Sequence, residues 1–176
     1  LGARKGKYGK DGRVNPMPGS NIPLATLGTF ILWMGWFGFN GGSQLKMSTI
    51  EDANAVAQVF VNTNMGAAGG LIAALITARL LFGKSDLTMV LNGALAGLVA
   101  ITAEPLTPSA LQATLIGGVG GVLVVFSILG LDKLKLDDKF LVRGWGQGGK
   151  GRVLDIATRF DRASRSLAKA VCKGRF

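Results

Sequence analysis

The 176-residue sequence contains no histidine, a single cysteine and few charged residues. Without histidine, the chain has no imidazole to act as a general base or a metal ligand. The one cysteine, Cys172, cannot build a disulfide scaffold. Only 17% of the residues are charged and 48% are hydrophobic, which excludes intrinsic disorder. The mean hydropathy of +0.38 points instead to a membrane protein.

The few charges divide the chain into three zones. Residues 139–176 hold 10 of the 20 basic residues and two acids, so this segment carries +8 of the net charge of +10. Residues 1–20 hold five basic residues against one acid, Asp11. We therefore predict a basic loop over 1–20, an apolar membrane region over 21–138 and a basic tail over 139–176.

Four charge-free stretches fill the apolar region, at residues 21–45, 53–78, 87–103 and 105–131. A helix needs about 20 apolar residues to cross the hydrocarbon layer of a bilayer. The predicted spans are residues 22–40, 54–80, 87–103 and 109–131. Surface helices of a soluble protein would show a polar face, so a buried soluble bundle is disfavoured. The predicted fold class is an all-α, polytopic membrane helix bundle with four transmembrane helices.

Basic and base-poor connections alternate along the predicted bundle. The basic ones are residues 1–20, the connection at 79–86 and the segment after residue 131, whereas residues 46–52 and 104–108 are poor in lysine and arginine. Lysine and arginine in short loops mark the cytoplasmic side. We therefore expect a multi-pass protein of the plasma (inner) membrane, with both ends of this chain in the cytoplasm.

Small residues recur at helical spacing inside the predicted spans. Residues 66–70 read GAAGG, Gly93 and Gly97 are four apart, and so are Gly117 and Gly121. Such spacing lets membrane helices approach closely. This pattern predicts tight packing of the bundle and identifies no substrate.

Polar and aromatic residues within the apolar region are the candidates for function. Asn62, Thr63 and Asn64 form one cluster, for which hydrogen bonds between helices are favoured over substrate contact. Five aromatic side chains fall within residues 30–39. They suit an interfacial aromatic belt, or a vestibule that holds a small monovalent cation by cation–π attraction. No predicted span contains a carboxylate that would serve a proton pump.

Several motifs, in order, resemble one membrane protein family. Residues 29–43 read TFILWMGWFGFNGGS, which closely resembles the sixth-helix signature of the ammonium transporter (Amt/MEP/Rh) family. Residues 60–63 (FVNT) resemble the seventh helix, and residues 92–102 (NGALAGLVAIT) resemble the eighth. Residues 117–138 resemble the ninth helix and the loop after it. The chain is therefore identified as resembling helices six to nine of an ammonium transporter.

The resemblance implies a homotrimer of eleven-helix subunits, each with its own pore for ammonium or ammonia across the lipid bilayer. It implies substrate-binding roles for Trp36 and Ser43 at an outer site. Phe39 matches one of two stacked phenylalanines that gate the pore. Asn40 and Thr102 match positions beside the pore. Apart from the resemblance, the sequence shows no catalytic dyad, metal-ligand set or cofactor motif, so we expect no catalytic residues, no metal and no cofactor, and the chain is not expected to be an enzyme.

One feature of the resembling family is missing. Its members conduct through two histidines, and the second should follow Asp137 and Asp138 closely, but residues 139–143 read KFLVR. We expect a fragment, produced by a reading-frame error, a rearranged gene or a genomic fragment. We also expect that the lone chain does not conduct ammonium.

The basic tail permits more than one interpretation. Residues 144–151 nearly match a phosphate-binding loop but lack its final serine or threonine, so we interpret the match as coincidence. Residues 155–171 predict a C-terminal amphipathic helix with a basic face, suited to an anionic membrane surface. A solvated extension is equally compatible, and no nucleic-acid partner is expected. The alternative function is a non-transporting membrane module whose basic tail binds anionic lipid or a partner.

Overall fold

A computed structural model of the chain describes residues 5–9, 11–17 and 19–135. In these ranges the chain forms four helices: α1 (Ile22–Gly42), α2 (Ile50–Phe82), α3 (Leu87–Ile101) and α4 (Ala110–Lys133). The predicted all-α class is confirmed, since the described part has no strand beyond an isolated bridge between Tyr8 and Val14. The predicted tail, with its amphipathic helix, lies outside the described residues.

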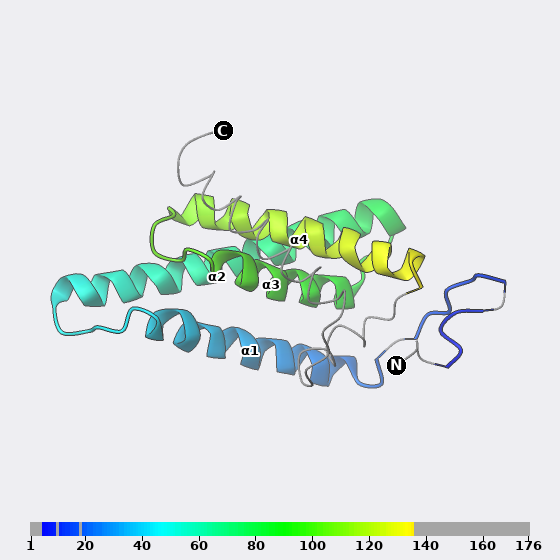
Figure 1. The fold of residues 1–176 in the computed structure, drawn as a ribbon, viewed down its shortest axis with the longest axis horizontal. Coiled ribbons are helices and arrows are strands. Elements are labelled where there is room, and N and C mark those ends of the chain that lie inside the picture. The colour runs from blue at the N-terminus through cyan, green and yellow to red at the C-terminus, as the bar shows by residue number, and fades with distance from the viewer. Residues whose placement is uncertain (1–4, 10, 18, 136–176) are drawn as a thin grey trace.

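The four helices run alternately in opposite directions (Figure 1). Short connections enforce this arrangement, because a few residues can only return the chain beside the helix it has just left. Helix α2 packs against both α3 and α4, while α1 packs against α2 and α3 and does not touch α4. The end of α1 and the connection at residues 102–109 therefore lie at one end of the bundle, and residues 5–17 lie at the other.

Side-chain caps set where the helices begin. At the start of α2, Thr49 Oγ1 accepts a hydrogen bond from the Asp52 backbone N–H, and the Asp52 carboxylate accepts one from the Thr49 N–H. This capping box satisfies backbone donors that have no partner within the helix. It also places two carboxylates, Glu51 and Asp52, at the positive end of the helix dipole. Helix α2 therefore begins four residues before the predicted span of residues 54–80, which starts after the charged residues Glu51 and Asp52.

Three of the four helices, α1, α2 and α4, are long and apolar enough to cross a membrane. Helix α3 has only 15 residues, which corresponds to a length of about 22 Å against a hydrocarbon layer of about 30 Å. It ends at Ile101, two residues before the predicted end, and the chain then turns toward Pro105 and Pro108. Four helices are confirmed, but four complete membrane crossings remain a prediction.

Glycine contacts hold α2, α3 and α4 together. A Cβ atom added to Gly117 would collide with the Gly66 carbonyl, and one added to Gly121 would collide with the Gly70 carbonyl. From α3, a Cβ atom added to Gly97 would collide with the same Gly66 carbonyl. Helix backbones that approach this closely gain van der Waals contact and exclude any larger side chain. The predicted role of the glycine spacing is confirmed.

Lys7, near the start of the chain, reaches the end of α4. Its ammonium group lies 2.9 Å from Asp132 Oδ1, and the Tyr8 hydroxyl donates to the same oxygen at 3.4 Å. The Lys7 side chain is only 8% exposed and its ammonium group lies 5.7 Å from the centroid of the Tyr8 ring. A charge this deeply buried requires a partner, so the pair fixes the segment around Lys7 against the bundle.

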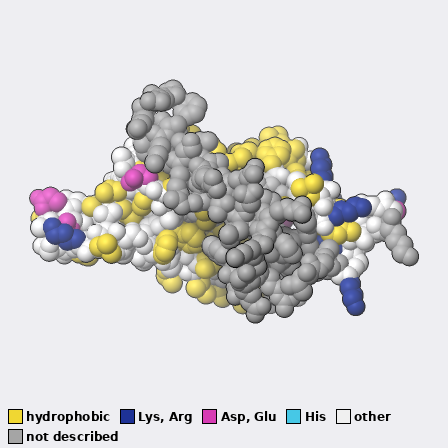
Figure 2. Space-filling view, in the orientation of Figure 1, with side chains coloured by type: hydrophobic (Ala, Val, Ile, Leu, Met, Phe, Trp, Pro, Cys, Tyr) yellow, Lys and Arg dark blue, Asp and Glu magenta, His cyan; other side chains and the backbone are white. Residues whose placement is uncertain are grey.

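The outer surface of the bundle is apolar between two charged ends (Figure 2). Large hydrophobic side chains of α1 point outward, including Phe30 at 60% exposure and Met34 at 69%. Water does not accommodate a continuous apolar surface of this kind, whereas lipid or further apolar helices do. The charges of the described residues lie before α1, in the connections and at the helix ends.

Candidate functional site

A chain of polar side chains connects α1, α2 and α3 near one end of the bundle. The Trp36 indole Nε1 donates to Thr102 Oγ1 at 2.7 Å, across 66 residues of sequence. The Asn40 amide Nδ2 donates to Thr63 Oγ1 at 3.0 Å. Thr102 Oγ1 lies 3.3 Å from Asn40 Oδ1, which joins the two pairs. We call Trp36, Asn40, Thr63 and Thr102 the polar network.

The helices bring these groups together by their periodicity. Trp36 and Asn40 are four residues apart, so they lie one turn apart on the same face of α1. Thr63 lies near the middle of α2, and Thr102 directly follows the last residue of α3. Asn40 is 2% exposed and Thr63 is fully buried. Polar groups buried at this depth need partners, and a satisfied network holds them rigidly.

An aromatic ring, that of Phe39, packs against the network. The Phe39 ring lies edge-on to Trp36, with 6.0 Å between ring centroids and 67° between ring planes. Phe39 is 61% exposed, whereas Trp36 is half-buried. Ring faces carry a partial negative charge and attract cations, so the exposed Phe39 ring beside the half-buried indole is suited to contact a small cation.

Ser43 does not join the network. Its hydroxyl donates to the backbone carbonyl of Phe39 at 2.8 Å, one turn back on α1, and the residue is exposed. The structure thus connects Trp36, Asn40 and Thr102 by hydrogen bonds and Phe39 by ring contact, while Ser43 lies beyond them at the end of α1. The substrate-binding role of Ser43 stays a prediction.

The predicted Asn62–Asn64 cluster has three different environments. Asn62 Nδ2 donates to the carbonyls of Pro105 and Pro108, at 2.9 and 2.7 Å, and so ties α2 to the connection between α3 and α4. Thr63 binds Asn40 of α1. Asn64 is exposed. The interpretation that this cluster links elements is confirmed for Asn62 and Thr63.

Thr63 is the member of the network that the sequence did not identify as a site residue. The available signal was its position next to Asn62 inside a charge-free helix. That signal indicates an interhelical contact but does not name the partner, because the partner depends on how α1 packs against α2.

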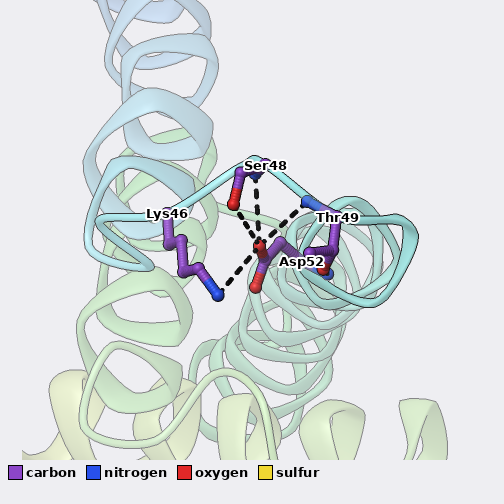
Figure 3. Close-up of polar contacts among 4 residues, drawn as sticks. All are labelled: Lys46, Ser48, Thr49 and Asp52. Atoms are coloured by element: carbon purple, nitrogen blue, oxygen red, sulfur yellow. Dashed lines mark hydrogen bonds and ion pairs between the residues drawn. The ribbon is translucent and has the colours of Figure 1, made fainter.

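A second polar cluster orders the connection between α1 and α2 (Figure 3). The Asp52 carboxylate accepts hydrogen bonds from the backbone N–H groups of Ser48 and Thr49, at 3.2 and 3.1 Å, and from the Ser48 hydroxyl at 3.3 Å. Lys46 Nζ lies 3.6 Å from the same carboxylate oxygen. These contacts hold the backbone of residues 46–49 against the first turn of α2. Across residues 5–9, 11–17 and 19–135, no group of three or more His, Cys, Asp or Glu side chains is arranged to hold a metal ion.

Apolar helices of membrane-spanning length, packed through glycine and surrounding a buried polar network, define a polytopic helical membrane protein. The family model of the Ammonium Transporter Family matches residues 1–144. The chain belongs to this family.

Individual relatives agree with this assignment. The ammonium transporter Amt2 of Archaeoglobus fulgidus is 43% identical over 138 residues, covering 78% of this chain and 29% of that protein. An ammonium transporter Amt2 of Methanocaldococcus jannaschii is 39% identical, covering 78% of this chain and 30% of that protein. A solved structure named Sensor Amt Protein superimposes with a TM-score of 0.73 at 32% identity, covering 97% of this chain and 47% of that one. The chain therefore spans less than a third of the length of these two transporters.

Proposed function

We propose that this chain supplies part of an ammonium-conducting path through a membrane. The observation that carries the proposal is the polar network, which fixes the Trp36 indole beside the exposed ring of Phe39. It occurs in a chain of the Ammonium Transporter Family, and the relatives at 39–43% identity are named ammonium transporters. The substrate comes to this chain from those names.

The proposed mechanism assigns one task to each predicted site residue. Trp36 and Ser43 recruit ammonium from the aqueous side, with the indole face supplying cation–π attraction. Phe39 acts as the gate, because its exposed ring must move or be passed by the permeant. Asn40 and Thr102 line the path behind the gate; Thr102 accepts the indole N–H, and Asn40 contacts Thr102. Beyond them, an apolar path favours a permeant that leaves its charge outside or moves its proton separately.

We also propose how the chain assembles and how it is oriented in the membrane. A homotrimer in the plasma membrane follows from the family resemblance. A cytoplasmic location for both ends of the chain is supported by the charge distribution, because residues 5–17 and residues 79–86, with Arg79 and Lys84 against Asp86, carry an excess of basic residues.

The test is a chimera in which residues 1–138 replace the matching segment of the Archaeoglobus fulgidus Amt2 relative. The readout is methylammonium uptake in cells that lack their own ammonium transporters. We expect saturable uptake, and we expect Trp36→Leu to raise the KM by about tenfold, as the loss of roughly 1–2 kcal/mol of cation–π attraction and hydrogen bonding would do. Trp33→Leu is the matched control, since Trp33 stacks on Phe30 and has no hydrogen bond to the network. A chimera that reaches the membrane without transporting, or Trp36→Leu uptake equal to the control, would contradict the proposal.

A further inference from the structure

The hydroxyl of Thr63 has one proton, and its geometry shows where that proton goes. Thr63 Oγ1 lies 2.6 Å from the carbonyl oxygen of Val59, one turn back on α2. A carbonyl can only accept, so the hydroxyl proton is committed to this short bond. Toward α1, the Thr63 oxygen therefore acts only as an acceptor.

This acceptor fixes the orientation of the Asn40 amide. Asn40 Nδ2 lies 3.0 Å from Thr63 Oγ1, so the amide donates toward α2 and its carbonyl Oδ1 faces Thr102. If the amide were flipped, its NH₂ group would lose the Thr63 oxygen as its acceptor. Asn40 is 2% exposed, so water cannot replace that acceptor.

The orientation of the Asn40 amide in turn determines which N–H groups reach the Thr102 oxygen. The Thr102 hydroxyl donates to the Leu98 carbonyl at 2.7 Å and lies 3.3 Å from Asn40 Oδ1. The indole N–H of Trp36 can only donate, so Thr102 accepts it at 2.7 Å. In the observed orientation each threonine oxygen accepts one N–H group, Thr63 from Asn40 and Thr102 from Trp36. A flipped Asn40 would direct its NH₂ group at Thr102, whose two lone pairs would then have to accept both the amide and the indole, while Thr63 would accept neither.

We propose that Thr63 is a positioning residue for the substrate site: through the orientation of the Asn40 amide, it holds the Trp36 indole on Thr102. Thr63 itself touches neither Trp36 nor the permeant. This inference rests on the proposed function, because the indole is the group that recruits ammonium there. It assigns to α2 a part in a site that the sequence placed on α1 and the end of α3.

The first experiment reads the Trp36 hydrogen bond directly and needs no transport. The full 176-residue chain carries Trp33→Phe and Trp145→Phe, so that Trp36 is the only tryptophan, and the indole nitrogen is labelled with ¹⁵N. In detergent micelles, Thr63→Val is expected to move the indole N–H proton resonance upfield, as a weakened hydrogen bond does. Thr63→Ser keeps the acceptor and is expected to retain the wild-type position. Thr63→Ala provides a second variant without an acceptor if valine prevents folding.

Thr77→Val is the matched control on the same helix. Its hydroxyl makes the same bond to the carbonyl one turn back, at 2.7 Å to Ala73, and it contacts no member of the network. An unchanged indole resonance in Thr63→Val and Thr63→Ala would overturn the inference. A shift of equal size in Thr77→Val would do the same, since it would show only a general loosening of α2.

The second experiment separates this inference from the proposed function. In the transporting chimera, Thr63→Val is expected to raise the KM about fivefold, corresponding to one lost hydrogen bond, with Vmax retained and Thr63→Ser restoring the wild-type KM. If the chimera transports and the Thr63 variants leave both the KM and the indole resonance unchanged, the inference is wrong and the proposed function stands. If the wild-type chimera does not transport, the proposed function fails, and with it the substrate role of Thr63, whatever the resonance shows.

Discussion

At the scale of single residues, Asn62 joins α2 to the connection between α3 and α4. It is fully buried and donates to the carbonyls of both Pro105 and Pro108. Replacing it by leucine of similar volume would leave these two carbonyls without donors. Because an unsatisfied buried acceptor costs about 1–3 kcal/mol, we expect Asn62→Leu to lower the free energy of unfolding by about 2–4 kcal/mol. The measurement is denaturant unfolding of the full chain in detergent.

Asn64→Leu is the matched control for that substitution. Asn64 lies on the same helix two residues later, is exposed, and its side chain has no hydrogen-bond partner among the described residues. We expect this variant to stay within about 0.5 kcal/mol of wild type. Equal losses in both variants would show that the leucine side chain, rather than the lost hydrogen bonds, destabilises the bundle.

The sequence predicted the site residues on α1 better than their contacts. The aromatic run and the family resemblance together named Trp36, Phe39 and Asn40, which the structure places within one turn of each other. The bond between Trp36 and Thr102 was not predictable, because it depends on the crossing of α1 and α3 rather than on local periodicity. Ser43 lies only three residues after Asn40, but its hydroxyl turns back to its own helix.

At the scale of helices, the predicted segments were correct, as were the starts of α1 and α3, but the other ends were off by one to four residues. Absence of charge located all four helices, since a polar side chain inside an apolar bundle is costly. The same criterion placed the start of α2 too late, because Glu51 and Asp52 were treated as a loop. The sequence did contain the correct signal, a threonine followed three residues later by an aspartate, which is the pattern of a capping box.

Close packing between α2 and α4 provides the prediction at this scale. We expect Gly117→Ala to lower the free energy of unfolding by about 1–3 kcal/mol, because its methyl group would collide with the Gly66 carbonyl and force the helices apart. Gly130→Ala on the same helix is the control, since nothing lies within 4 Å of its added Cβ. There we expect no loss, or a gain of up to about 1 kcal/mol from the higher helix propensity of alanine. The check is thermal unfolding of both variants in the same detergent, and a similar loss in both would refute the packing argument.

At the scale of the whole molecule, the two ends of the bundle differ in charge (Figure 2). The end formed by residues 43–52 and 102–109 has one base against three acids, namely Lys46 against Glu51, Asp52 and Glu104. The opposite end has an excess of bases among its described residues: Lys5, Lys7, Arg13, Arg79, Lys84, Lys133 and Lys135 against Asp11, Asp86 and Asp132. Helix α2, at 33 residues or about 50 Å, is longer than the hydrocarbon layer, so its charged first turn can lie outside it.

This asymmetry predicts the orientation of the chain, because lysine and arginine in short connections remain on the cytoplasmic side. In a Cys172→Ser background, Met47→Cys and Lys84→Cys place one exposed thiol at each end of the bundle. We expect a membrane-impermeant maleimide to label Met47→Cys in intact cells, and to label Lys84→Cys only after the cells are lysed. The reverse pattern would invert the orientation and put the polar network, which lies toward the Met47 end, on the cytoplasmic side. An outer recruitment site for ammonium would then be untenable, so this measurement also tests the direction in which the proposed path begins.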